Sequence, residues 1–432
     1  MSGDTASRPF DFETRQVHAG EVIDREVGAR ITPIYQTAGY QFEGFDDGEA
    51  RFAGRSVGRA YSRSENPTNA VAARRLADLE GGQDAILVGS GQAAIATTLF
   101  SLAAAGDHVL ATERLYEGTR DLFGSGLKRQ GIEVEYLPED ASADEWAARV
   151  RPTTRALYTE TVPNPLNEIP DLERLAGIAH AHGLPFVVDS TVATPYLCRP
   201  IEWGADIVIH STSKWLAGHG AVIGGAIIDA GTFDWAGNAE RFPHLTQQPR
   251  PGVASPVERF GATAFLGYVR SVTVLDFGPT VPPSSTFLLL HGIETLSLRM
   301  ERHVANSQTV AEALQGHPAV THVHYPGLVG DRFHDRAAKY LPLGAGAIVS
   351  FELAGGRDAA RTFIDSLGLI SPMTHIGDVR SLALHTGSTI HGKLTEEARL
   401  ELGVTPGLVR LSIGIESARD LVADVLQALD RV

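Results

Sequence analysis

The chain has 432 residues, of which 43% are hydrophobic and 21% are charged, a balance typical of globular proteins. Its formal net charge of −15 disfavours nucleic acid and anionic membranes as partners. A single cysteine, Cys198, excludes an intramolecular disulfide framework and a cysteine-rich zinc site. The polar start does not resemble a signal or transit peptide, and no apolar run reaches the roughly 20 residues of a membrane span. We therefore expect a cytoplasmic protein.

Residues 1–65 show no sustained period and are rich in Gly, Asp and Arg, which predicts an extended arm with short turns. From about residue 70, short β-rich runs alternate with longer helical patterns. The patterns predict strands near 84–90, 107–112, 132–138, 155–161, 185–190, 206–211 and 224–229, and helices over 91–106, 118–131 and 171–183. This alternation predicts an α/β domain over residues 66–285, with a mostly parallel sheet covered on both faces.

After about residue 285 the pattern changes. One long helix is predicted over 286–315, followed by strands near 320–326, 347–356, 379–385 and 408–416 and a final helix over 418–430. Residues 286–432 therefore read as a smaller α+β domain. In open parallel sheets, ligands bind at the carboxyl ends of the strands, so candidate functional residues are expected there.

Several chemically active side chains follow predicted strands. Lys214 comes just after strand 206–211, where lost solvation would lower the pKa of its amine and allow a Schiff base with an aldehyde. The hydroxyls of Ser211 and Ser213 lie two positions apart in the same turn and could both contact phosphate oxygens. Asp189 ends the preceding strand, and a protonated pyridine nitrogen would be a suitable partner for its buried carboxylate.

The sequence VGSGQAAI ends another predicted strand and opens a helix, where the backbone N–H groups of Gly91 and Gln92 form a natural phosphate site. Aldehyde, phosphate and pyridine nitrogen together describe pyridoxal 5′-phosphate (PLP). Two alternatives stay open. Each residue alone is more often an ordinary loop or capping residue. Gly89 and Gly91, followed by Asp107, also match a G-x-G-x-x-A dinucleotide pattern, which would indicate a nicotinamide-dependent oxidoreductase but leaves the lysine and the aspartate unexplained.

The histidines give a weaker signal. His322 and His324 alternate along a predicted strand and face one side, but no carboxylate or cysteine partner follows at a useful spacing. We therefore predict no metal site. His210 and His219, near Lys214, are expected to pack or to form hydrogen bonds.

Seven stretches are spread along most of the chain, between positions 61 and 416: YSRSENPT, SGQAA, RLYEGT, ETVPNP, DSTVATPYLCRPIEWGADIVIHSTSKWLAGHG, GIETLSLRMERHVANSQ and LVRLSIGIE. They resemble the Cys/Met-metabolism PLP-dependent enzymes. Within this family, YLPLGAGAIVSFELAGG, THIGDVRSLALH and LTEEARLELGVTPGLVRLSIGIES are similar to the O-acetylhomoserine sulfhydrylase branch. The resemblance implies an aspartate-aminotransferase-like α/β fold (PLP fold type I) with a smaller α+β C-terminal domain.

The resemblance also implies a role for each matching residue. Lys214 would hold PLP covalently and then move protons, with Tyr116 stacking on the ring and sharing the proton transfer. The other implied cofactor contacts are Gly91, Gln92, Asn164, Asp189, Thr191, Ser211 and Ser213, with Tyr61 and Arg63 supplied by a neighbouring subunit. Arg410 would bind the substrate carboxylate, and Ser381 and Tyr61 are further implied substrate contacts.

The implied reaction is γ-replacement on an O-acylated homoserine, above all O-acetyl-L-homoserine, by sulfide or a thiol. The products would be homocysteine or methionine plus acetate. A cystathionine- or methionine-type γ- or β-lyase is the alternative within the family. The implied assembly is a homotetramer whose active sites are shared across a dimer interface, with the arm of residues 1–65 reaching the neighbouring subunit.

The chain departs from the branch pattern in five places. Two of them, STSK and DST in the cofactor motifs, keep hydroxyl or small residues and leave the cofactor prediction unchanged. The other three bear on the substrate. These are HTGSTIHGK, with Thr386, Gly387 and Ile390 changed, PPSSTF, with Ser284 and Ser285 changed, and TQQPRPGVASPVERFG. We expect these positions near the substrate, so they leave the acyl group and the sulfur donor open.

Overall fold

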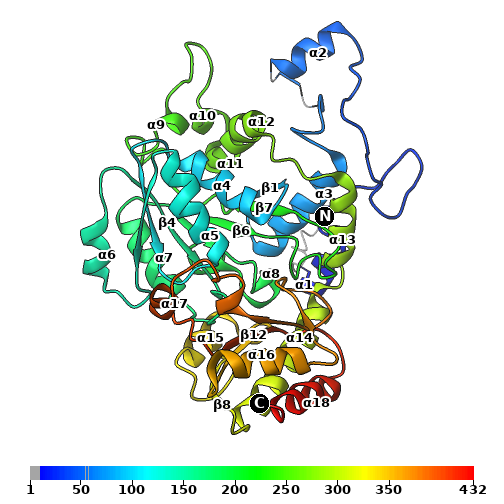
Figure 1. The fold of residues 1–432 in the computed structure, drawn as a ribbon. Coiled ribbons are helices and arrows are strands. Elements are labelled where there is room, and N and C mark those ends of the chain that lie inside the picture. Colours follow the sequence, from blue (N-terminus) through cyan, green and yellow to red (C-terminus); the bar gives the residue numbers. More distant parts are fainter. Residues whose placement is uncertain (1–9, 54, 57) are drawn as a thin grey trace, which may run out of the picture.

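The computed structural model describes residues 10–53, 55–56 and 58–432, which form two sheets with helices around them (Figure 1). The large sheet has the order β1-β7-β6-β5-β4-β2-β3. Only β7 runs antiparallel to its neighbours within this sheet; the other pairs are parallel. Its strands, all of them predicted, are β1 (Asp84–Val88), β2 (His108–Thr112), β3 (Glu133–Leu137), β4 (Thr154–Glu160), β5 (Phe186–Asp189), β6 (Ile207–His210) and β7 (Gly225–Asp229).

The large sheet is buried on both faces because its strands carry apolar side chains at successive positions. Leu157 and Val188 belong to one hydrophobic cluster, whereas Tyr158 and Val187 belong to the other, as the two-residue period of a strand requires. The helices that contribute to the first cluster include α3 (Pro67–Glu80) and α7 (Leu172–Ala181), and those of the second include α4 (Gly91–Leu102) and α11 (Ala264–Tyr268). The predicted three-layer arrangement is therefore confirmed.

Shorter helical segments complete this part of the chain. The predicted helix over 118–131 is an α-helix that continues as a π-helical turn. The segments are α5 (Glu117–Asp121), η1 (Leu122–Leu127), α6 (Ala143–Arg149), α8 (Thr194–Leu197), η2 (Pro200–Trp203), α9 (Pro243–Thr246), α10 (Pro256–Phe260), η3 (Gly261–Thr263), η4 (Val269–Thr273) and α12 (Val274–Phe277). Those after β7 were not predicted, because they are too short to show a helical period.

The smaller sheet has the order β10-β11-β12-β9-β8 and is antiparallel except for the β10–β11 pair. Its strands are β8 (Val320–His324), β9 (Ile348–Leu353), β10 (Ser371–Pro372), β11 (Leu382–His385) and β12 (Leu408–Ser412). Helices around it are α14 (Leu296–Gln315), α15 (His334–Tyr340), α16 (Gly356–Ser366), η5 (Thr386–Ser388), α17 (Glu396–Glu401) and α18 (Ala418–Leu429). This is the predicted α+β arrangement, and its core is continuous with one face of the large sheet.

The single long helix predicted over 286–315 is wrong, because the structure contains two helices, α13 (Pro283–Ile293) and α14. The break has a packing reason. Gly292, near the end of α13, lies against the loop that carries Lys214, where an added Cβ would be 2.4 Å from a backbone oxygen. After the break, the buried Arg299 guanidinium of α14 donates to the carbonyl groups of Gly292 and Trp215. The two helices therefore hold the loop between β6 and β7, residues 211–224, which is called the lysine loop below.

The arm is less extended than predicted, since it contains two short helices, α1 (Phe12–His18) and α2 (Phe45–Phe52). Helix α1 packs on α3 and α14, while α2 stands away from the body (Figure 1). The predicted domain boundary after residue 285 falls inside α13, which packs on α3, so that division of the chain stays a prediction. Among the described residues, no helix has both the length and the apolar character needed to cross a bilayer.

Candidate active site

A cavity of about 460 Å³ opens at the carboxyl ends of β4, β5 and β6, between the two sheets. This is the edge of the sheet where the sequence places its chemically active residues, and the size is typical of a small-ligand site. The predicted residues that line it are Gly91, Gln92, Tyr116, Asn164, Asp189, Thr191, Ser211, Ser213, Lys214 and Arg410. Residues from positions 91 to 410 therefore meet in one place.

Lys214 lies in the loop that follows β6, one residue before the fully buried Trp215. The Nζ atom of Lys214 is 3.1 Å from Nδ1 of His375, a cavity residue from the segment between β10 and β11. Burial, together with the positive charge of Arg410, lowers the pKa of the Lys214 amine to about 8. Near neutral pH this amine can therefore both hold and release a proton, as the sequence predicted.

Two carboxyl groups form the floor of the cavity. Asp189 ends β5 and Glu160 ends β4, and the two residues are paired in the parallel register. Burial raises the pKa of both groups, and the charge of Asp189 raises that of Glu160 further. In the described part of the chain neither carboxylate forms an ion pair, so this floor suits a positively charged ligand group.

The start of α4 forms a polar cradle at one side of the cavity. Ser90 caps the helix by accepting a hydrogen bond from Ala93, which leaves the first-turn N–H groups of Gly91 and Gln92 without intrahelical acceptors. Gly91 is required here because an added Cβ would lie 2.6 Å from Cβ of Ser211. An anion is the natural occupant of such a helix start with hydroxyl groups opposite.

Two predicted cofactor residues have their hydroxyl groups engaged in holding the loops. The Oγ1 atom of Thr191 accepts a hydrogen bond from the Ser211 N–H at 2.7 Å, and the Thr191 N–H donates to Asp189. The Oγ atom of Ser213 accepts from the Gly224 N–H at 3.0 Å. These bonds fix the backbone around the cradle while each side chain still lines the cavity.

Tyr116 precedes α5 and presents its ring to the cavity, with 42% of the residue exposed. Its backbone N–H donates to Oε1 of Glu160 at 2.8 Å, which ties the ring to the carboxylate floor. Burial, with Glu160 nearby, raises the pKa of the Tyr116 phenol. A half-open aromatic ring over the cavity is suited to stacking on a flat ligand.

Arg410 on β12 is only 2% exposed. Its Nη1 atom donates to Oδ1 of Asn164 at 3.4 Å, and Nη2 donates to the carbonyl oxygens of Thr374 and His375. The Nε atom has no hydrogen-bond partner among the described residues, and all these acceptors are neutral. A buried guanidinium without a carboxylate partner is a candidate binding site for an anion from outside the protein.

Three predicted residues do not reach the cavity of this chain. Ser381 is 1% exposed, and its hydroxyl donates to Glu416 and accepts from the Gly414 N–H, so it serves the packing of its own loop. Arg63 donates to the Leu275 carbonyl oxygen and lies over the ring of the half-exposed Tyr61. Among the departures from the branch pattern, Ile390 lines the cavity of this chain. Thr386, Gly387, Ser284, Ser285 and residues 246–261 do not line it.

Comparison with known proteins identifies the family of this chain. Residues 13–430 match the family described as Cys/Met metabolism PLP-dependent enzyme. The chain belongs to this family. The family assignment confirms the predicted resemblance and the predicted cofactor, and it leaves the nicotinamide hypothesis without support.

Several individual proteins are similar to this family member. A homocysteine synthase of Schizosaccharomyces pombe is 44% identical over 97% of this chain and 98% of its own. O-acetyl-L-homoserine sulfhydrylase 1 of Thermus thermophilus is 44% identical over 97% of this chain and 99% of its own. The structure of a Campylobacter jejuni protein named as an O-acetylhomoserine (thiol)-lyase aligns with a TM-score of 0.94 and 35% identity over 98% of this chain and 100% of its own. That structure contains a pyridoxyl-lysine monophosphate group.

The cavity of this PLP-dependent family member fits the cofactor. The Lys214 amine is suited to the aldehyde, the cradle at the start of α4 to the phosphate, and the carboxyl floor to the pyridine nitrogen. The predicted fold type is likewise confirmed by the aligned structure.

Sequence reasoning missed several cavity residues, among them the titratable Glu160 and His375. Glu160 ends β4 as Asp189 ends β5, so the argument from strand ends could have found it. His375 gives no such signal, because it stands 161 positions from Lys214 and follows a strand of only two residues.

Proposed function

We propose that this enzyme carries out PLP-dependent γ-replacement on an O-acylated homoserine, with O-acetyl-L-homoserine as the favoured substrate and sulfide or a thiol as the nucleophile. The products would be homocysteine, or methionine, and acetate. The names of the homologues support this reaction, since two proteins of nearly equal length and 44% identity are called homocysteine synthase and O-acetyl-L-homoserine sulfhydrylase. The structural observation that carries the proposal is the buried Arg410, whose partners among the described residues are all uncharged, together with the Lys214 amine in the same cavity.

In this proposal, Arg410 binds the carboxylate of the amino acid. Its guanidinium is already oriented by Asn164 and by two backbone carbonyl groups, so two N–H groups can point in a fixed direction at the anion. Binding the carboxylate there brings the α-carbon of the substrate toward Lys214. Lysine in place of Arg410 could supply the charge but not the planar pair of donors.

Lys214 would carry the protons of the reaction. PLP, when bound, supplies an electron-accepting ring next to the substrate α-carbon. The neutral Lys214 amine would take the Cα proton and would have to give it up within the site, with the help of Tyr116, before it could take a second proton from Cβ as acetate leaves from Cγ. The sulfur nucleophile would then add at Cγ, and one proton would return to each of Cβ and Cα. A pKa of about 8 suits this task, because neither direction of transfer is strongly uphill near neutral pH. Tyr116 is proposed to stack on the ring and assist the proton transfer.

The remaining proposed cofactor contacts are local. The N–H groups of Gly91 and Gln92, with Ser211 and Ser213, would hold the phosphate, while Asp189 pairs with the pyridine nitrogen. Thr191 supports both groups through its bonds to Asp189 and to the Ser211 N–H. Asn164 would donate to the phenolic oxygen of the cofactor.

We further propose that Tyr61 and Arg63 complete the site of a neighbouring subunit, in at least a dimer and by resemblance a tetramer. In the single chain they lie outside the cavity, and the arm that carries them exposes large apolar side chains. Ile23 is 77% exposed and Phe45 is 85% exposed, which a second copy of the chain would relieve. A role for Ser381 in substrate binding has no such support. A cytoplasmic location is proposed from the sequence.

A substrate panel tests the function. O-acetyl-, O-succinyl- and O-phosphohomoserine are each offered with sulfide, with methanethiol and without a sulfur donor, and acetate or the other leaving group, homocysteine and ketobutyrate are measured. Leaving-group release that requires the sulfur donor and equals homocysteine formation supports γ-replacement. Ketobutyrate and ammonia released at full rate without a donor would instead establish a lyase. Turnover of only the succinyl or phospho ester would overturn the acetyl assignment.

A further inference from the structure

The imidazole of His375 is a direct neighbour of the Lys214 amine. Its Nδ1 atom is 3.1 Å from Nζ of Lys214, and the residue also lines the cavity. The contact between His375 and Lys214 is not part of the residue roles that the family resemblance implies, nor of the proposed function.

The backbone around His375 is held by two hydrogen bonds to β12 and by close packing on the loop that carries Lys214. The carbonyl oxygen of His375 accepts a hydrogen bond from Arg410 at 3.2 Å, and the N–H of Gly377 donates to Oγ of Ser412 at 3.0 Å. Gly377 has φ 79° and packs so closely on the lysine loop that an added Cβ would lie 2.6 Å from the backbone nitrogen of Trp215. The segment cannot move away from the lysine loop without breaking these contacts.

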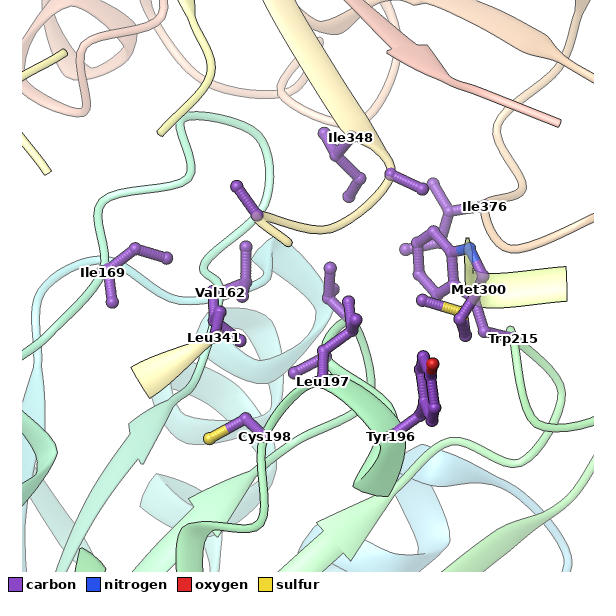
Figure 2. Packing of buried hydrophobic residues seen from close by; sticks show 14 of the residues in the cluster. Val162, Ile169, Tyr196, Leu197, Cys198, Trp215, Met300, Leu341, Ile348 and Ile376 are labelled. Atoms are coloured by element: carbon purple, nitrogen blue, oxygen red, sulfur yellow. The ribbon is translucent and has the colours of Figure 1, made fainter. Parts of the chain in front are cut away.

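The residues that follow the two partners share one core. Trp215 follows Lys214 and Ile376 follows His375, and both side chains belong to the same buried cluster, which also contains Met300 (Figure 2). Rigid packing of these neighbours fixes where the amine and the imidazole can meet.

The ring of His375 directs its one hydrogen bond at Lys214. Its other nitrogen, Nε2, is buried and has no partner within the described ranges of the chain. An ammonium group is a donor only, so when Lys214 is protonated Nδ1 must accept and the ring proton lies on Nε2.

Charged groups around the ring keep it neutral. Burial and the positive charges of Lys214 and Arg410 lower the pKa of His375 to about 4, while Asp378 acts in the opposite direction. At neutral pH the imidazole is therefore an acceptor, not a second cation beside the amine.

We propose that His375 is a positioning residue for Lys214, whose amine it holds through Nδ1 at the point in the cavity where protons are exchanged with the substrate. The inference rests on the proposed function of Lys214 as the proton carrier. It assigns His375 no contact with the substrate.

The chain offers a clean test, because it contains only four lysines, Lys128, Lys214, Lys339 and Lys393. The full-length protein, stripped of bound cofactor, is labelled with trace acetic anhydride across a pH series. Mass spectrometry of the four lysine peptides then gives the pKa of each amine. In His375→Leu the acceptor is lost but burial is kept, so we expect the pKa of Lys214 to fall by about one unit.

Two further variants make the result specific. His375→Asn should restore the pKa of Lys214, because a carboxamide oxygen can take the place of Nδ1. His219→Leu is the matched control, since His219 lies five positions from Lys214, is exposed and bonds to the Ala217 carbonyl group; it should leave the pKa of Lys214 unchanged.

The other three lysines report on folding. If the His375→Leu protein does not fold, His375→Gln, whose amide extends toward the Nε2 position, replaces it.

A Lys214 pKa that is the same in the Leu or Gln variant as in the wild type would overturn the proposal. In the loaded enzyme, kcat should fall at least about tenfold in His375→Leu and recover in His375→Asn, with a smaller change in KM. If the wild type turned over no acylated homoserine, the proposed function would fail, but the amine titration would still decide whether His375 holds Lys214.

Discussion

Glu160 and Asp189 end neighbouring parallel strands at paired positions, so two carboxyl groups face the same end of the cavity. Within the described residues, the groups that donate to these carboxylates are neutral: the Tyr116 N–H donates to Glu160 and the Thr191 N–H to Asp189. Two buried carboxylates without a cation are costly, and this cost raises the pKa of both. The cavity is therefore most stable when a positive group, such as a protonated pyridine, lies at this floor.

Removing one of these charges should stabilise the cofactor-free protein. The pKa of Glu160 is raised in the folded state, so unfolding releases a proton and folded-state stability falls as pH rises above the ordinary Glu range. Glu160→Gln keeps the acceptor for Tyr116 but removes the charge. We expect its Tm to exceed that of the wild type by about 2 °C at pH 7 and to match it near pH 4.

The cofactor provides the control for this effect. With PLP bound, the gain of Glu160→Gln should shrink, because the ring nitrogen offsets the carboxylate charge. Glu139 is a buried carboxyl outside the cavity whose pKa burial raises to about 7. Glu139→Gln should stabilise equally with and without PLP. Differential scanning calorimetry measures the Tm of both variants with and without PLP. An equal Tm gain for Glu160→Gln in both states would contradict the placement of the pyridine nitrogen at the Glu160–Asp189 floor.

Arg410 should control binding of the amino acid more than the rate of the chemical step. Arg410→Lys keeps a positive charge but loses the paired donors, so KM for the amino acid should rise about 100-fold with a smaller change in kcat. Steady-state kinetics with varied O-acetylhomoserine measure this split. Arg332→Lys, at an exposed ion pair with Asp140, is the control. A variant whose kcat alone falls would argue against carboxylate binding.

The sequence predicted the large sheet and the cavity lining well because both follow from local rules. Strands with continuous apolar runs can only be buried on both faces, and polar residues at their carboxyl ends must meet at one edge. The break between α13 and α14 could not be predicted, because it depends on contacts between segments that are distant in the sequence. Gly292 and Arg299 pack on the loop that carries Lys214. The place of His375 beside Lys214 could not be predicted for the same reason.

Gly377 offers a test of how closely the His375 segment packs on the lysine loop. Gly377 and Gly81 have nearly the same φ, 79° and 81°, but an added Cβ at Gly81 meets nothing within 4 Å. Gly81→Ala should therefore cost only the backbone strain, about 1 kcal/mol. Gly377→Ala adds a steric clash with Trp215 and should cost about 1–3 kcal/mol more. Urea unfolding of both variants measures the difference, and equal losses would show that the loop can give way.

The covalent anchor can be located directly. Borohydride reduction of the purified protein, followed by peptide mass spectrometry, should find the pyridoxyl group on Lys214 and on none of the other three lysines. Lys214→Ala should carry no adduct and should lose at least about a thousandfold in turnover, because anchor and proton carrier are lost together. An adduct on Lys128, Lys339 or Lys393 would overturn the assignment of the whole cavity.

A shared active site makes a prediction about mixtures of inactive proteins. In a dimer of Lys214→Ala with Arg63→Ala, one site carries both defects and the other site carries neither. If Arg63 serves the neighbouring subunit, unfolding and refolding the two variants together should restore some activity. Lys214→Ala mixed with Arg410→Ala is the matched control, because both residues line the cavity of the same chain, and every hybrid site keeps one defect. Recovery in the first mixture alone, measured as homocysteine formation, requires that the arm crosses the interface; recovery in neither would place Arg63 outside the site.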